Sequence, residues 1–420
     1  MEEKNLSRQA MSHERQLKNY ISTFPDYMQK YFTENPSSST LNTLYNYALD
    51  MNAFMQYMRR TESSLRHTES HDFPLSVFEN FTSYDAQSYL VTLELGQARN
   101  TVSRKYTSLV SFFKYLNVTR QIDNFPFLTV TRPKPTKGDI NIYLSDKQIS
   151  RVLNGTLKST RYLVKNEDGT HASLPITTAV RFKKEKTAYR NYAILMAFTH
   201  TGINVSELIA LNLNDVHFDE GYFSVVRKDG KRKAVYFDQK TADALRLYLN
   251  GDKLPEDLLR KYPDFRNISD FCRIYMAAAD IERRAAREYS RDDDEFLGDI
   301  ERIARWHRKR GREALQAAPG ENALFISIRG TRMSVRMVEV MVREMVMTYL
   351  PDLPYGNKIT PSRLRASYAA NAVTAGEDPL WAARQMGVQK VELPDLVKTE
   401  LVRQAKDRFT SRNLREDDKQ

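Results

Sequence analysis

Apolar residues recur at intervals of three and four in three stretches near the start of the chain. They cover Thr40 to Arg60, Pro74 to Tyr89 and Thr101 to Leu116. This spacing gathers the apolar side chains on one face of each helix, as burial of that face requires. The pattern predicts an all-helical N-terminal domain over residues 1–123.

The stretch 124–142 breaks this periodicity. It contains three prolines together with Arg132, Lys134 and Lys137. Because proline lacks a backbone N–H and interrupts helices, such a segment stays extended and charged. We interpret it as a basic linker between two domains.

A second domain is expected over residues 143–410. Ser145 is suited to cap a helix that begins just after it. Residues 155–185 show no period and are interpreted as a loop insertion. An apolar helix from Tyr189 to His200 follows, and Gly202 is a residue type that ends helices.

This domain also contains a densely charged stretch, about residues 251–320. We interpret it as an exposed insertion, and a dedicated binding arm is the alternative. The C-terminal segment has one apolar stripe, in which the residues lie four apart: Val397, Leu401, Ala405 and Phe409. We expect this stripe to dock on a neighbouring protomer, and packing within its own chain is the alternative. Residues 411–420 form a polar tail.

Two β-rich runs, 222–226 and 234–237, flank a basic segment with Asp229-Gly230 at its centre. An Asp-Gly pair between such runs is a strong turn signal. The pattern predicts a β-hairpin with a basic tip. The basic residues of this tip are Arg227, Lys228, Lys231, Arg232 and Lys233.

The composition narrows the class of partner. Lys and Arg number 64 against 53 Asp and Glu, a formal net charge of +11, and the pI is about 9.4. This excess of positive charge favours a polyanion, nucleic acid above all, as the binding partner. Acidic substrates and ribosomal or membrane surfaces are the alternative partners. The single cysteine, Cys272, excludes an internal disulfide, and we expect no metal and no cofactor. The first ten residues lack the apolar segment of a secretory signal and no long apolar run occurs, so we expect a cytoplasmic protein without membrane contact.

Two short motifs carry a resemblance to a known family. Residues 360–371, TPSRLRASYAAN, and residues 201–208, TGINVSEL, resemble the T-P-H-x-L-R-H-x-x-A and T-G-x-R-x-S-E-L boxes of the tyrosine recombinase (phage integrase) family. Segments such as Phe24–Tyr27 and Ser111–Leu116 are similar to the XerS type, which resolves chromosome dimers as a single protein. The resemblance covers most of the chain outside 155–180 and about 251–320.

The resemblance implies a mainly α fold with a small β-hairpin or sheet. It implies two domains, a helical core-binding domain and an α+β catalytic-like domain. In that family a tyrosine attacks the scissile phosphate, two arginines and histidines hold its non-bridging oxygens, and a lysine protonates the leaving 5′ oxygen. Fixed cationic donors are needed because the phosphodiester gathers negative charge in the transition state.

Three family positions are retained in this chain: Lys228 matches the lysine, Arg365 the second arginine, and Glu207 the acidic residue of the first box. The others are degenerate: the first arginine falls on Asn204, the histidines on Ser362, Ala366 and Val388, and the nucleophile on Val397. No tyrosine follows Tyr368, which matches an aromatic core position and is predicted to pack in the core. Losing one preorganised donor costs a factor of about 10²–10³ in rate. We therefore predict a catalytically inactive pseudo-recombinase.

Double-stranded DNA is the expected partner of such a protein, which would be nucleoid-associated. The expected contact residues are Arg132, Lys134, Lys137, Arg227, Lys228, Lys231, Arg232, Lys233, Arg363 and Arg365. Two of these residues have an alternative role. Lys228 could be an ordinary solvated charge, and Arg365 could pair with a carboxylate. A homo-oligomer on DNA, or an active recombinase, is a further possible partner. The alternatives for the whole protein are an active site-specific recombinase with unorthodox residues and a protein-interaction scaffold.

Overall fold

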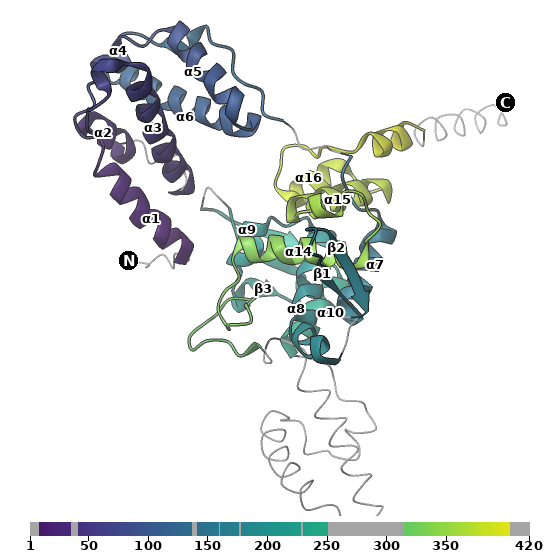
Figure 1. Ribbon diagram of the computed structural model, residues 1–420. Helices are drawn as coiled ribbons and strands as arrows, with labels where there is room; N and C mark the ends of the chain where they lie inside the picture. The colour runs from purple at the N-terminus through teal and green to yellow at the C-terminus, as the bar shows by residue number, and fades with distance from the viewer. Residues whose placement is uncertain are drawn as a thin grey trace, which may run out of the picture. The chain divides into compact units, whose positions relative to one another are not determined.

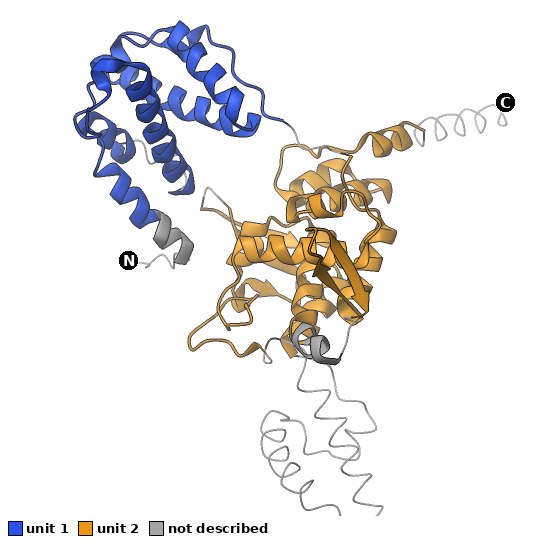
Figure 2. Cartoon of the chain, viewed as in Figure 1, with its two compact units in different colours: residues 1–138 blue, residues 139–420 orange. Residues whose placement is uncertain are grey.

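The computed structural model describes residues 8–34, 41–136, 141–158, 160–175, 178–227, 230–250, 312 and 315–403. The chain divides into two compact units, residues 1–138 and 139–420 (Figure 2). The described residues are mainly helical, with two small antiparallel sheets, which confirms the predicted secondary-structure class. The charged stretch 251–311 and the tail 411–420 lie outside the described residues.

The first unit is a group of helices around an aromatic core (Figure 1). The ring of Phe78 lies at its centre, with its centroid 5.2 Å from that of Phe112 and 5.4 Å from that of Phe113. Such edge-on pairs contribute about 0.5–1.5 kcal/mol beyond the burial of their area. The helices are α1 (Arg8–Ile21), α2 (Asp26–Glu34), α3 (Leu41–Thr61), α4 (Ser76–Glu79), α5 (Ser83–Gly96) and α6 (Arg99–Val118), with the 3-10 turns η1 (Ser63–Leu65) and η2 (Pro126–Leu128).

The stretch 74–89 forms two helices, so the prediction of one continuous helix was wrong. Thr82 begins the second helix, α5, as its N-cap. The Thr82 N–H donates to Asp85 Oδ2 at 2.9 Å, and the Asp85 N–H donates to Thr82 Oγ1 at 3.3 Å. This reciprocal capping box starts a new helix inside an otherwise helical pattern.

The segment 124–130 belongs to the core of the first unit, so the extended linker begins later than predicted. Phe127 and Val130 are buried, and the Tyr106 hydroxyl donates to the Val130 carbonyl at 3.2 Å. Apolar side chains carried by a Pro-rich segment thus anchor it to α6. Arg132 and Lys134 follow and are exposed, whereas Lys137 lies outside the described residues.

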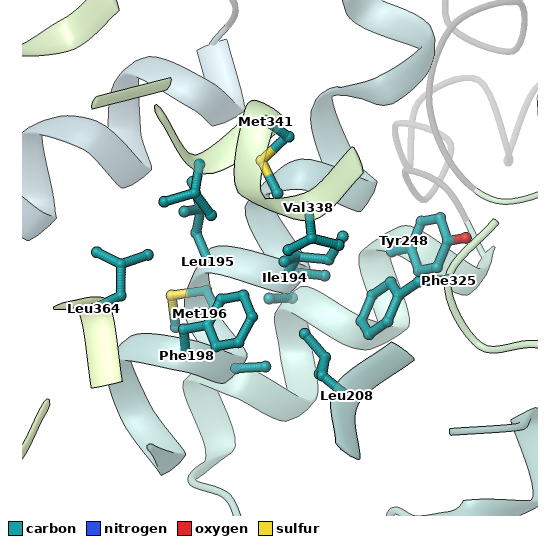
Figure 3. Close-up of a cluster of buried hydrophobic side chains, with 14 of the residues drawn as sticks. Ile194, Leu195, Met196, Phe198, Leu208, Tyr248, Phe325, Val338, Met341 and Leu364 are labelled. Atoms are coloured by element: carbon teal, nitrogen blue, oxygen red, sulfur yellow. The ribbon is translucent and has the colours of Figure 1, made fainter. Parts of the chain in front are cut away.

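The second unit is built around one central helix, α8 (Thr178–Thr201), which packs against α7, α10 and α15. The side chains from Ala193 to Phe198 are all buried, and a helix that is apolar on every side must be surrounded by other elements. Figure 3 shows Ile194 and Phe198 of α8 among buried side chains from other helices and loops. The other helices of this unit are α7 (Asp146–Lys158), α9 (Val205–Ala210), α10 (Gln239–Asn250), α14 (Val335–Tyr349), α15 (Pro361–Thr374) and α16 (Pro379–Met386), with the 3-10 turns η3 (Leu213–Asp215) and η6 (Gly356–Lys358) and a helical segment over 395–403.

Residues 161–175 form a β-hairpin, so the prediction of a loop over 155–185 was wrong. Strands β1 (Arg161–Lys165) and β2 (His171–Pro175) pair antiparallel, and the Ser173 hydroxyl donates to the Thr348 carbonyl of α14 at 2.6 Å. The strands are short and only partly buried, so their sequence shows little alternation of apolar and polar residues. Helix α8 also begins earlier than expected, at Thr178 instead of Tyr189.

The second sheet has the order β3-β4-β5 and contains the predicted hairpin, which is confirmed. Its strands are β3 (Val216–His217), β4 (Tyr222–Val226) and β5 (Arg232–Tyr236). At its turn the Gly230 N–H donates to the Arg227 carbonyl at 2.9 Å. Lys228 and Asp229 lie outside the described residues.

Two further local predictions are confirmed in this unit. The Ser145 hydroxyl accepts from the Gln148 N–H, so Ser145 caps α7 as expected. Gly202 follows α8 with a φ of +62°, and a Cβ there would lie 2.5 Å from Tyr368 Cδ1. The helix ends at a position that only glycine fits. Within the part of the chain that the structure describes, we find no helix with both the length and the apolar character needed to cross a membrane.

Candidate functional site

Asn204 lies in the turn between α8 and α9 and is the N-cap of α9. Its side-chain oxygen accepts from the Ser206 N–H at 2.9 Å, and its own N–H donates to Glu207 Oε2 at 3.2 Å. Asparagine is among the preferred residues at this position because its side chain satisfies a backbone donor that the helix leaves unpaired. The side chain of Asn204 therefore points to the backbone of its own helix.

Glu207 links α9 to the end of β4. While Oε2 accepts from Asn204, Oε1 accepts from Arg227 Nη1 at 2.7 Å. The two side chains of this ion pair are only 12% and 18% exposed. An ion pair shielded to this degree is less screened by salt than one on the surface. Arg227 is thereby held at one position beside α9.

Arg227 and Arg365 meet at one backbone carbonyl. Arg227 Nη1 donates to Met386 O at 3.3 Å, and Arg365 Nη2, which comes from α15, donates to the same oxygen at 2.6 Å. Met386 is the last residue of α16, where carbonyl groups lack helical partners and carry partial negative charge. Helices α15 and α16 pack against each other in the second unit (Figure 1).

Gly387 is required for this arrangement twice over. Its φ is +70°, in the left-handed region, where it ends α16. A Cβ at this position would also lie 2.2 Å from Arg227 Nη1. Any other residue would therefore strain the backbone and displace the Arg227 guanidinium.

Lys233 of β5 completes the group, since its ammonium donates to the Arg384 carbonyl in the last turn of α16. Burial lowers the pKa of Lys233, and the charge of Arg227 lowers it further. Burial likewise lowers the pKa of Arg365, while Glu207 opposes this shift. We call Glu207, Arg227, Lys233 and Arg365 the cationic cluster. It holds three positive charges against one carboxylate.

Two nitrogens of the cationic cluster are buried without a hydrogen-bond partner among the described residues. They are Arg227 Nη2 and Arg365 Nη1. A buried donor left unpaired costs about 1–3 kcal/mol, and more for a charged group. Planar guanidinium groups match the oxygens of carboxylates and phosphates, so the arrangement can bind an oxyanion.

The histidine positions of the resemblance offer no imidazole near this cluster. Ser362 is exposed in the first turn of α15, and Ala366 is half-buried one turn later. Val388 follows Gly387 and is 39% exposed. None of these three side chains can carry a positive charge.

The two positions considered for a nucleophile are both buried. Val397 is 4% exposed, in the helical segment that Asn141 anchors by accepting from the Asp395 N–H at 3.0 Å. Tyr368 is 6% exposed and packs with Ala369 and Met386, which confirms its predicted place in the core. Burial raises the pKa of the Tyr368 hydroxyl to about 12.

The remaining predicted DNA contacts lie outside the cationic cluster. Arg232 pairs with Asp215 at 2.9 Å and is 63% exposed, and Lys231 is exposed beside it. Arg363 is half-buried on α15. In the first unit, Arg132 Nη2 donates to Thr107 Oγ1 at 3.4 Å. Lys137 and Lys228, the match to the family's lysine, lie outside the described residues.

Sequence reasoning did not anticipate that Arg227 pairs with Glu207. Arg227 is one of five basic residues at the hairpin tip, and no spacing singles it out. The available signal was indirect. This chain retains Glu207 of the first box but has no arginine at position 204. The carboxylate of Glu207 therefore needed a hydrogen-bond donor from elsewhere in the chain.

Comparison with known proteins gives the following matches. No protein-family model matches the chain. Tyrosine recombinase XerC of Syntrophus aciditrophicus (strain SB) is 27% identical over 209 residues, 50% of this chain and 57% of that protein. Tyrosine recombinase XerS of Lactococcus lactis subsp. cremoris (strain MG1363) is 26% identical over 237 residues, 51% of this chain and 64% of that protein. The chain is similar to bacterial tyrosine recombinases.

The matching segment thus spans about three fifths of the length of these two curated relatives. A longer match, 21% identical over 348 residues and 83% of both chains, is to a putative tyrosine recombinase of Caldanaerobacter subterraneus subsp. tengcongensis.

Among solved structures, the Tn1549 transposon integrase in complex with circular intermediate DNA is 12% identical, with a TM-score of 0.48 over 92% of this chain and 94% of that chain. Since XerC and XerS relatives match equally well, the comparisons do not select one type.

Proposed function

We propose that this protein binds double-stranded DNA and does not cleave it. Two observations together carry the proposal. The protein has a cationic cluster at Arg227 and Arg365, and it has a buried valine, Val397, at the position expected for the nucleophile. In this proposal the first unit is a core-binding domain and the second a catalytic-like domain of the XerS type. The protein acts as a regulator or as an accessory to an active recombinase, associated with the nucleoid in the cytoplasm.

Binding is supported by the distribution of charge. The whole chain has a formal net charge of +11, and the cationic cluster alone has two more positive charges than negative ones. Exposed Arg132 and Lys134 add positive charge to the first unit. Cations of this kind bind the phosphates of a duplex and release its counterions.

The absence of cleavage is supported by the chemistry of the two candidate positions. A valine side chain has no atom that can attack phosphorus. Tyr368 is 6% exposed and packs in the core, and burial raises the pKa of its hydroxyl to about 12. The alternative, an active recombinase, requires a different nucleophile.

We propose that residues 395–403 of the C-terminal segment pack against their own chain. Val397 is buried and Asp395 is bonded to Asn141 of the same unit. These contacts support packing within the chain for the first half of the apolar stripe. Ala405 and Phe409 lie outside the described residues, and a role for them in an oligomer on DNA stays a prediction.

The test is a gel-shift titration of duplex DNA at several salt concentrations. If six to ten phosphates are engaged, affinity should fall by roughly 10³–10⁵ between about 50 and 200 mM salt. Replacing Arg132 and Lys134 together by alanine should reduce the salt slope by about two. Arg336→Ala is the control and should leave the slope unchanged, since Arg336 is an exposed arginine on α14 that is not a predicted DNA contact. Absent or salt-insensitive binding would overturn the proposal.

A further inference from the structure

We propose that Arg227 takes over the role of the arginine that is missing at position 204, so that Arg227 and Arg365 together bind one phosphodiester group of the DNA. This inference rests on the proposed DNA binding. It assigns a specific ligand, the two non-bridging oxygens of a single backbone phosphate, to two specific side chains. Arg227 reaches the site from the end of β4, whereas position 204 lies at the start of α9.

Glu207 holds a guanidinium although position 204 has none. Asn204 uses its side chain to cap α9, and Glu207 Oε1 is left to accept from Arg227 Nη1 at 2.7 Å. The carboxylate thus orients an arginine contributed by a different element. The guanidinium is fixed on two sides, by Glu207 and by the Met386 carbonyl.

One carbonyl oxygen joins the two arginines. Met386 O accepts from Arg227 Nη1 and from Arg365 Nη2, so the two guanidinium groups are neighbours. Like charges at such short range repel each other, and Glu207 offsets only one of them. A bound anion would relieve this repulsion.

Both arginines also have an unsatisfied donor. Arg227 Nη2 and Arg365 Nη1 are both buried, and neither has a partner among the described residues. Each guanidinium therefore has one nitrogen whose hydrogen-bonding capacity no described residue satisfies. The two non-bridging oxygens of a phosphodiester supply two anionic acceptors on one phosphorus.

The test replaces single phosphates of a bound duplex by neutral methylphosphonate linkages, one at a time. With the unaltered protein, one position per bound protomer should weaken binding more than neutralisation of any other contacted phosphate does, by about 10- to 100-fold, the loss typical of charge-assisted hydrogen bonds. With Arg227→Gln or Arg365→Gln, the same linkage should cause little further loss. Arg336→Gln is the matched control, since this exposed arginine of α14 pairs with Glu339 and is not a predicted DNA contact. It should leave the sensitive position unchanged.

A second set of variants separates phosphate binding from structural bracing. Arg227→Gln alone leaves Glu207 without its partner, so Arg227→Gln is also made together with Glu207→Gln, and Glu207→Gln alone serves as the reference. Glutamine at 207 still has an oxygen to accept from the Asn204 N–H. If Arg227 binds phosphate, the neutral linkage that weakens binding of the Glu207→Gln reference should no longer weaken binding of the double variant. This should hold even when the two variants have equal thermal stability.

The outcomes distinguish this inference from the proposed function. If DNA binds but the linkage profile of Arg227→Gln matches that of the unaltered protein, the inference is overturned and DNA binding stands. If DNA does not bind, inorganic phosphate is the probe. Phosphate should raise the melting temperature of the unaltered protein and of Arg336→Gln above that in chloride of equal ionic strength, but not that of Arg227→Gln. No such rise would reject the anion site as well.

Discussion

Asn204 and Glu207 bond to each other across the first turn of α9, with the Asn204 N–H donating to Glu207 Oε2 at 3.2 Å. The Asn204 side chain in turn accepts from the Ser206 N–H at 2.9 Å. The position where the resemblance expects a catalytic arginine is therefore a helix cap in this protein. An arginine side chain cannot accept a hydrogen bond and cannot replace it.

We expect Asn204→Ala to lower the free energy of unfolding by about 1 kcal/mol, because the first turn of α9 loses its cap. Asn204→Ser should retain most of the stability, since a serine hydroxyl accepts the same bond. Asn204→Arg should lose about as much as alanine. Urea unfolding of the three variants measures these differences, and an Asn204→Ala variant as stable as the original would contradict the cap.

Gly387→Ala should be more damaging than an alanine at another glycine with similar backbone conformation. An alanine in the left-handed region costs about 1–2 kcal/mol. At Gly320, where φ is +76° and no atom lies near the added Cβ, that cost should be the whole effect. At Gly387 the Cβ also meets Arg227 Nη1, so unfolding should need still less denaturant and DNA affinity should fall. Equal losses at the two glycines would show that Arg227 moves aside freely.

The carboxylate of Asp238 should make stability depend on pH on the acid side. Burial raises its pKa, but hydrogen bonds from His200 and Thr241 outweigh burial and bring the pKa below its ordinary value. A carboxyl whose pKa is lower in the folded protein stabilises it above the unfolded pKa of about 3.9, and that stability is lost as the pH falls through the folded value.

We therefore expect the free energy of unfolding to fall below about pH 5, with a smaller slope in Asp238→Asn. Asp238 also accepts from the Thr241 N–H at 2.9 Å at the start of α10, so asparagine keeps a cap at this position. Asp219→Asn, at an exposed turn, is the control. Urea unfolding at several pH values measures the slopes, and the same acid slope in Asp238→Asn as in the original would reject the assignment.

No covalent bond between protein and DNA should form with a suicide substrate, whether the substrate is nicked or intact. Val397→Tyr alone should not create one, because Asn204, Ser362 and Val388 still lack the donors of the resemblance. It should instead destabilise the second unit by about 1–3 kcal/mol, since Val397 is buried and tyrosine is larger.

The measurement is a denaturing gel of the reaction with labelled DNA. A retarded species that disappears in Tyr368→Phe would make Tyr368 the nucleophile and overturn the claim that cleavage is absent. A retarded species from Val397→Tyr would show that the remaining donors suffice. With Tyr368→Phe we expect an unchanged gel and nearly unchanged folding, because the aromatic ring that fills the core is retained.

Local patterns in the sequence were enough to predict much of the fold. The cap at Ser145, the helix end at Gly202 and the β4–β5 hairpin each depend on residues close together in the chain. The same patterns were insufficient for residues 161–175. There the strands are short and half-exposed, and the Ser173 bond to Thr348 that holds them is distant in sequence. The division of 74–89 into two helices was readable in principle, from Thr82 and Asp85.

The sequence by itself determined which chemical groups this protein has: a valine at 397, where the resemblance expects a tyrosine, an asparagine at 204, where it expects an arginine, and an excess of basic residues. The tertiary structure decided which of these groups act together. Glu207, Arg227, Arg365 and Met386 come from four elements, and only packing brings two guanidinium groups to one carbonyl oxygen. A side chain's spacing in the chain limits its position along one helix or strand, whereas its distance to another element depends on how the whole core packs.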